Sequence, residues 1–276
     1  MSKNENILVI GGAGSKTGRR VAQRLSERGV PVRLASRSSE PSFDWEDRST
    51  WAAALEGATA AYITYYPDLA VEGSSERIRA LAELAVAQGA RRLVLLSGRG
   101  EEEAERAEQE LLAVDPTATI VRCSWFMQNF DETYFAEALA VGELALPAGD
   151  VREPFVDAED IADVAVAALT EDGHAGQLYE LTGPRMLSFG EVVGEIARAT
   201  GKPLRYEPIP IDAFAAGLGE EGVPADVVDL LRYLFTEVLD GRNESLTDGV
   251  QRALGREPRD FVAYADRAAA AGAWSA

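Results

Sequence analysis

The stretch Ile7-Leu8-Val9-Ile10, followed by Gly11-Gly12-Ala13-Gly14-Ser15-Lys16-Thr17-Gly18, decides the fold of this chain. The four apolar residues predict a buried strand, and residues 19–25 have the spacing of a helix. A strand, a glycine-rich turn and a helix form the arrangement in which backbone N–H groups hold the diphosphate of a dinucleotide. Glycine is needed because the turn requires angles that a Cβ forbids and because the phosphate comes close to the main chain.

The spacing of the glycines is irregular for such a loop. Gly11, Gly14 and Gly18 are three and then four residues apart, one residue more than the common patterns allow. An ordinary tight turn between strand and helix is therefore the alternative. We expect a cofactor site that includes Gly11, Gly12, Gly14, Ser15, Lys16, Thr17 and Gly18.

Short apolar strands and helices alternate through the first half of the chain. Strands are expected at 30–35, 58–65, 93–96 and 119–123, with helices at 17–28, 50–55, 75–88 and 101–114. This alternation predicts an α/β fold of Rossmann type with a doubly wound parallel sheet. In the second half, Ser188 and Glu191 form a capping-box pattern, and prolines and glycines separate several helices. We expect a NAD(P)-binding core at 1–185 and a smaller, mostly helical substrate lobe at 186–276, in one compact unit.

The composition limits the class of partner. The 276 residues carry a formal net charge of −19, and acidic residues occur throughout. This argues against nucleic acid, which requires a basic footprint, and against an anionic membrane surface. A single cysteine, Cys123, excludes an intrachain disulfide, and neither a signal-peptide pattern nor a membrane-length apolar run is present. We expect a cytoplasmic monomer or homodimer that acts on a small molecule.

The end of the second expected strand indicates which dinucleotide binds. The sequence there is Ala35-Ser36-Arg37-Ser38-Ser39, and the first carboxylate is Glu40. An acidic residue at this place holds the ribose hydroxyls of NAD, whereas an arginine accommodates the extra phosphate of NADP. We therefore expect NADP(H), with Ser36, Arg37 and Ser38 at that phosphate. A solvated loop arginine is the alternative.

Several motifs together resemble a known family. They are the loop Gly11–Gly18, Ala35–Ser38, Phe43-Asp44-Trp45 with Trp51, Val121-Arg122 with Trp125–Phe130, Phe155-Val156-Asp157 with Asp160-Ile161-Ala162, and Tyr179–Pro184. In this order the chain resembles the NmrA-like branch of the atypical short-chain dehydrogenase/reductases, and in particular bacterial relatives of the ergot-alkaloid-type reductases.

The resemblance implies further site residues. Asp44 and Trp45 are expected at the adenine, Thr64 and Tyr65 at the adenosine ribose and phosphates, and Ser97 at the nicotinamide ribose. Cys123, Ser124 and Trp125 are expected near the nicotinamide ring. Trp125, Phe126, Asn129 and Phe155 are expected to line the substrate pocket. Core packing is the alternative for Trp125, Phe126 and Phe130.

The resemblance also shows a departure. Family members use a tyrosine and a lysine four residues apart to exchange a proton with the substrate. Here Glu102 and Arg106 stand at those positions. The catalytic residues are therefore unknown. An iminium substrate accepts hydride without a proton, so the sequence favours reduction of C=N or activated C=C over that of a simple C=O bond. A non-catalytic NADP(H)-sensing regulator and a redox-neutral enzyme on the same fold are the alternatives.

Other candidate chemistry is weak. His174 is the only histidine and is expected in an exposed turn, so we expect no metal site. The run Glu101-Glu102-Glu103 is expected to be a solvated helix start. Cys123 is expected to be a small buried residue, because no histidine near it in the sequence would activate it.

Overall fold

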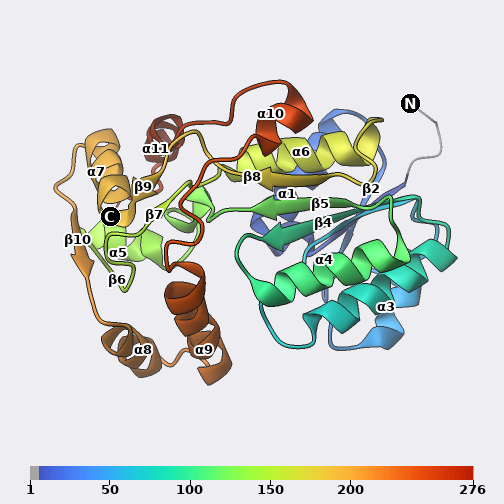
Figure 1. Ribbon diagram of the computed structural model, residues 1–276, viewed down its shortest axis with the longest axis horizontal. Coiled ribbons are helices and arrows are strands. Elements are labelled where there is room, and N and C mark those ends of the chain that lie inside the picture. The colour runs from blue at the N-terminus through green and yellow to red at the C-terminus, as the bar shows by residue number, and fades with distance from the viewer. Residues whose placement is uncertain (1–5, 276) are drawn as a thin grey trace. The chain divides into compact units, whose positions relative to one another are not determined.

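A parallel sheet of six strands carries the glycine-rich loop at the end of β1 (Figure 1). The computed structural model describes residues 6–275. The strand order is β2-β1-β3-β4-β5-β8, and all pairings in this sheet are parallel. The bounds are Ile7–Ile10 (β1), Val32–Ala35 (β2), Ala60–Ile63 (β3), Arg92–Gly98 (β4), Thr119–Cys123 (β5) and Leu178–Leu181 (β8). The order reverses between β1 and β3, which is the switch point where doubly wound sheets bind ligands.

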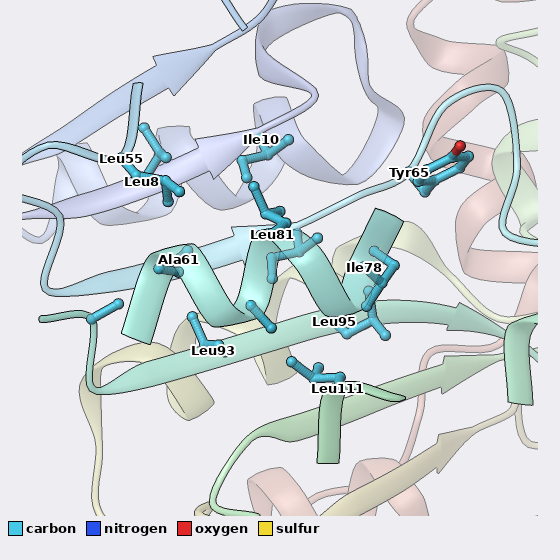
Figure 2. Packing of buried hydrophobic residues seen from close by; sticks show 14 of the residues in the cluster. Leu8, Ile10, Leu55, Ala61, Tyr65, Ile78, Leu81, Leu93, Leu95 and Leu111 are labelled. Atoms are coloured by element: carbon cyan, nitrogen blue, oxygen red, sulfur yellow. The ribbon is translucent and has the colours of Figure 1, made fainter. Parts of the chain in front are cut away.

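Helices cover both faces of this sheet, as the apolar strands require. Figure 1 shows α1 (Lys16–Glu27) and α6 (Ala158–Thr170) on one face, and α3 (Ser74–Ala87) and α4 (Glu102–Val114) on the other. A short turn at Arg48–Thr50 leads into α2 (Trp51–Leu55). Figure 2 shows the apolar side chains of the strands facing those of α3 and α4; the labelled ones include Leu8, Ile10, Ala61, Leu93, Leu95, Ile78, Leu81 and Leu111. The Rossmann-type fold is thereby confirmed.

Charged contacts hold the helix that begins at the glycine loop. Arg20 Nε donates to Glu159 Oε1 at 2.6 Å, and Arg24 Nε donates to Asp163 Oδ1 at 2.6 Å. These side chains are half-buried, so solvent screens the pairs less than it screens surface pairs. Helix α1 is therefore fixed to the first half of α6 by charged contacts as well as by apolar packing.

The chain divides into two units, and each is discontinuous in sequence. The first unit contains the described residues through Cys123, Ala158–Leu181 and Asp248–Arg256. The second contains Ser124–Asp157, Thr182–Thr247 and the residues from Glu257 onward. This division differs from the expected single boundary at residue 185. The chain leaves the first unit after β5, returns for α6 and β8, and returns again for α10 (Gly249–Leu254), which packs beside β8.

The second unit combines helices with two small sheets around an aromatic core. Strand β6 (Glu143–Leu146) pairs in parallel with β10 (Arg205–Pro208), and β7 (Arg152–Glu153) pairs antiparallel with β9 (Leu187–Ser188). The ring of Phe130 contacts the rings of four other phenylalanines at its centre. Its helices are α5 (Phe135–Val141), α7 (Phe189–Thr200), α8 (Ile211–Glu220), α9 (Ala225–Tyr233) with a π-helical turn at Leu234–Val238, and α11 (Phe261–Ala270).

The predicted capping box at the start of α7 is confirmed. Ser188 Oγ accepts from Glu191 N at 3.2 Å, and Glu191 Oε2 accepts from Ser188 N at 2.8 Å. Among residues 6–275, the structure has no helix that is both long and apolar enough to span a membrane.

Candidate functional site

The glycine loop leaves β1 through two residues in the left-handed region. Gly11 has φ of 95° and Gly12 has φ of 55°, and Gly11 N donates to Ala35 O at 3.0 Å. Ser15 then caps α1, because its Oγ accepts from Gly18 N at 3.1 Å. Gly14 is exposed, and a Cβ added there would meet nothing within 4 Å. The loop is thus closely packed at Gly11 and open at Gly14, where a ligand can approach the main chain.

The end of β2 presents an arginine to solvent. Arg37 is exposed, and its guanidinium carbon lies 5.7 Å from the ring centroid of the exposed Tyr66. Within residues 6–275 no salt bridge involves Arg37. Ser36 Oγ and Ser38 Oγ are 3.2 Å apart beside it. The guanidinium and two hydroxyls therefore form a group that fits a phosphate monoester.

The residues expected at the adenine belong partly to the core. The Trp45 indole is buried, and its Nε1 donates to Thr64 O at 3.2 Å. Its ring centroid lies 4.7 Å from that of Tyr65. Asp44 is half-buried, and its O accepts from Trp51 Nε1 at 2.7 Å. The structure brings Asp44, Trp45 and Tyr65 together, and contact of any of them with adenine stays a prediction.

The carboxyl ends of β3, β4 and β5 contribute polar side chains that are already engaged. Thr64 Oγ1 donates to Ile10 O at 2.8 Å, and Ser97 Oγ donates to Glu108 Oε1 at 2.5 Å. Both side chains are buried. Figure 2 shows Tyr65 beyond the end of β3, at the margin of the apolar cluster to which it belongs. The expected ribose contacts of Thr64, Tyr65 and Ser97 therefore stay predictions.

Cys123 ends β5, and the thiol is buried as expected. Burial is the main cause that raises the pKa of this thiol well above its ordinary value, and the neighbouring Glu101 carboxyl adds to the shift. A thiolate is therefore disfavoured, which argues against a nucleophilic role. Ser124 is also buried, and its Oγ has no hydrogen-bond partner in the described part of the chain.

The four residues expected at the substrate pocket lie in the second unit. Phe126 pairs with Val156 in an isolated parallel bridge, which holds residues 124–130 beside residues 155–157. Trp125, Phe126 and Asn129 are half-buried. Phe155 is 1% exposed, and its ring packs on Phe130, Phe189 and Phe261. The expectation that Phe155 lines a pocket is corrected, because its side chain is part of the aromatic core.

The positions at which family members have the catalytic tyrosine and lysine are solvated in this chain. Glu102 and Arg106 face each other across one helical turn at 3.7 Å, and both side chains are exposed. Tyr62, in β3, is fully buried, and burial raises the pKa of its phenol above the ordinary value. Neither group fits the role of a proton donor that the tyrosine and lysine of the family would fill.

Sequence reasoning missed a buried pair of carboxyl groups. Glu101 was expected to be solvated with its neighbours, but it is 9% exposed, and its carboxyl lies against Gly98 at the end of β4. Asp68, from the loop after β3, is its partner. Burial first, and then the charge of Asp68, raises the pKa of Glu101 well above its ordinary value. The only signal in the sequence was a glycine three residues before the glutamate.

His174 is also placed differently from the expectation. It is 7% exposed rather than in an exposed turn, and its Nδ1 lies 2.8 Å from the Tyr179 hydroxyl. Thr119 Oγ1 donates to the backbone O of His174 at 2.8 Å. The histidine therefore anchors the turn before β8. Among the described residues, no group of three or more His, Cys, Asp or Glu side chains could hold a metal ion.

Comparison with known proteins shows the family of the chain. Festuclavine synthase II of Penicillium roqueforti is 30% identical over 94% of this chain and 97% of its own length. The NAD(P)H azoreductase of Xenophilus azovorans is 29% identical over 96% of this chain and 98% of its own length. The structure of the NADPH-dependent quinone oxidoreductase QOR2 of Escherichia coli, complexed with NADPH, has a TM-score of 0.75 at 21% identity. The match covers 95% of this chain and 99% of the QOR2 chain, and it shows that the two proteins share a fold. The model of the NmrA-like family matches residues 3–264, and this chain belongs to that family.

Proposed function

We propose that this oxidoreductase uses NADPH to reduce a C=N, activated C=C or C=O bond of a small aromatic or polycyclic metabolite. The observation that carries the proposal is the pairing of an open glycine loop with an exposed arginine. Gly14 leaves space next to the main chain at the start of α1, and Arg37 stands at the tip of β2 beside β1. The cofactor supplies a hydride when it is bound.

The residues fit the two ends of the adenosine half of that cofactor. The N-terminus of α1 favours the negative charge of a diphosphate through its backbone N–H groups and its dipole. The guanidinium of Arg37 presents a planar fork to a phosphate monoester. NADH lacks that phosphate, so the absence of a carboxylate between Ala35 and Ser39 favours NADPH.

The positions that hold the tyrosine and lysine in the family supply no proton here. Glu102 and Arg106 occupy them, and both side chains are solvated. An iminium ion needs no proton on reduction, since the hydride neutralises its charge. The clavine and azo names of the relatives point to nitrogen-containing unsaturated substrates. A metabolite of natural-product biosynthesis with an iminium or conjugated group is therefore the favoured class.

The test is an NADPH oxidation assay with the purified chain. The panel contains a cyclic iminium ion, an enone, a quinone and an azo dye, and the loss of NADPH absorbance is followed with and without each acceptor. The proposal expects turnover of at least one acceptor and a preference for NADPH over NADH. Tight NADPH binding without turnover of any acceptor would contradict it and would favour a sensor.

A further inference from the structure

Glu101 places its carboxyl group in a space that exists because residue 98 is glycine. A Cβ built on Gly98 would stand 2.1 Å from Oε1 and 2.2 Å from Oε2 of Glu101. Glu101 is nine-tenths buried, and its Oε2 has no hydrogen-bond donor among the described residues. A buried carboxylate without donors is costly, so this group favours the protonated form.

Asp68, in the loop after β3, is the acidic neighbour of Glu101, and its charge acts on the Glu101 carboxyl. Two adjacent carboxyl groups repel each other when both are ionised, so these two groups, the acid pair, together favour holding one proton. Burial raises the pKa of Asp68, but less than that of Glu101, because Ala70 N donates to Asp68 Oδ1 at 2.9 Å and favours its ionised form. The shared proton therefore resides mainly on Glu101.

The charged groups around the acid pair do not neutralise it. Arg99 Nε donates to Glu180 Oε1 at 2.6 Å, and Arg122 Nε donates to Glu108 Oε1 at 2.9 Å. Glu108 adds a negative charge that further raises the pKa of Glu101. The thiol of Cys123 faces the pair from β5 in its neutral form. Among the described residues, no salt bridge involves either member of the acid pair.

The acid pair lies beyond the carboxyl ends of two central strands. Asp68 follows β3, Glu101 follows β4, and Gly98 is the register partner of Cys123 on β5. Arg37 marks the opposite side of the β1–β3 switch point, where the adenosine end of the cofactor is expected. A dinucleotide crosses the switch point, so its reactive end is expected toward β4 and β5. The acid pair therefore lies on the side of the sheet where the reduction is expected.

We propose that Asp68 and Glu101 share one proton at neutral pH and supply it to the substrate atom that does not receive the hydride. This inference rests on the reductase activity proposed above. Reduction of a C=O or conjugated C=C bond requires two electrons with the hydride and one proton. The carboxyl O–H bond breaks as the new O–H or C–H bond forms, and water returns the proton to the pair afterwards. An iminium substrate needs no proton and does not use the pair.

The shared proton is tested on the protein without cofactor. In 13C-labelled protein, the carboxyl resonance of Glu101 is followed against pH by NMR. We expect it to titrate above the ordinary glutamate value of about 4.3 and to shift toward that value in Asp68→Asn, which removes the neighbouring charge. An ordinary titration of Glu101 in the unsubstituted protein would overturn the inference, whatever the enzyme does with substrates.

The proton supply is tested by comparing two classes of acceptor. Glu101→Gln keeps the shape of the side chain, and we expect kcat with a quinone or enone to fall about 100-fold, the usual contribution of a general acid. Turnover of a cyclic iminium ion and the Kd for NADPH should be unchanged. Glu110→Gln, at a half-exposed glutamate in helix α4, which begins directly after Glu101, is the control. An equal loss for both classes indicates a structural role and overturns the inference. If the unsubstituted protein reduces no acceptor, the proposed function fails, and the NMR titration still decides the shared proton.

Discussion

Gly11 and Thr64 lie so close together that a Cβ on Gly11 would stand 2.1 Å from Thr64 Oγ1. The same hydroxyl donates to Ile10 O at 2.8 Å, so it fastens the last residue of β1 to the end of β3. The loop therefore leaves the sheet at a point where only glycine fits, both for space and for its φ of 95°.

Gly11→Ala should destabilise the first unit. The left-handed backbone and the collision with Thr64 together should lower the free energy of unfolding by about 2–4 kcal/mol. Urea unfolding measures the change, and the double variant Gly11→Ala, Thr64→Ala should recover part of the loss because the colliding oxygen is gone. Unchanged stability of the single variant would show that the loop can relax away from β3.

Gly14→Ala should weaken the binding of NADPH and leave the stability of the fold unchanged. A Cβ at this position has nothing within 4 Å, and Gly14 does not have a positive φ. The free energy of unfolding should stay within about 0.5 kcal/mol of the original value. The affinity for NADPH, measured by calorimetry, should fall about tenfold if the diphosphate approaches this residue. An unchanged affinity would place the diphosphate elsewhere.

Arg37→Ala should weaken NADPH far more than NADH. Loss of a charge-assisted contact to the phosphate should cost about 1.5–3 kcal/mol of binding free energy. Arg48→Ala is the matched control, because Arg48 is also an exposed arginine, 5.5 Å from the ring of Trp51. Calorimetric titration with both nucleotides measures the effect. Equal losses for NADPH and NADH would argue against a phosphate contact.

The sheet could be predicted from the sequence because each strand is encoded by a short, consecutive run of apolar residues. The apolar runs at Ile7–Ile10 and Leu93–Leu95 are buried, as the strands of a parallel sheet with both faces covered are. The glycine loop and the capping box of α7 are likewise encoded within a few residues. These elements depend on short-range chemistry, which a single sequence displays.

The buried acid pair and the division into units could not be predicted, because they depend on distant contacts. Asp68 and Glu101 are 33 positions apart, and Glu101 resembles the solvated glutamates that follow it. His174 is buried by Tyr179, which the strand β8 brings beside it. Residues 124–157 fold with Thr182–Thr247 and with the residues from Glu257 onward, and no change of composition marks these boundaries.

Arg267→Ala should destabilise the second unit. Arg267 donates to Asp157 Oδ2 at 2.5 Å, and Asp157 is fully buried while Arg267 is 49% exposed. Removal of the cation leaves a buried carboxylate with less compensation, which should cost about 3 kcal/mol. Arg198→Ala is the control, because Arg198 pairs with Asp266 at the surface, where such a pair contributes about 0–1 kcal/mol. Equal losses in urea unfolding would contradict the burial argument.

Glu101→Gln should become more stabilising, relative to the original protein, as the pH rises. The folded pKa of Glu101 is raised above the unfolded value, first by burial and then by Asp68. Its contribution to stability is therefore fully present below the unfolded pKa, about 4.3, and is lost as the pH rises through the folded value. Glutamine fills the same space and does not ionise.

The difference in unfolding free energy between Glu101→Gln and the original protein should therefore grow with pH, by up to about 1.4 kcal/mol per pH unit between those two pKa values. Urea unfolding at a series of pH values measures it, with Glu110→Gln as the control for the loss of a carboxyl group at a half-exposed position. If this difference in unfolding free energy stays constant or shrinks as the pH rises, Glu101 is ionised in the folded protein. The space next to Gly98 then holds a carboxylate rather than a carboxylic acid.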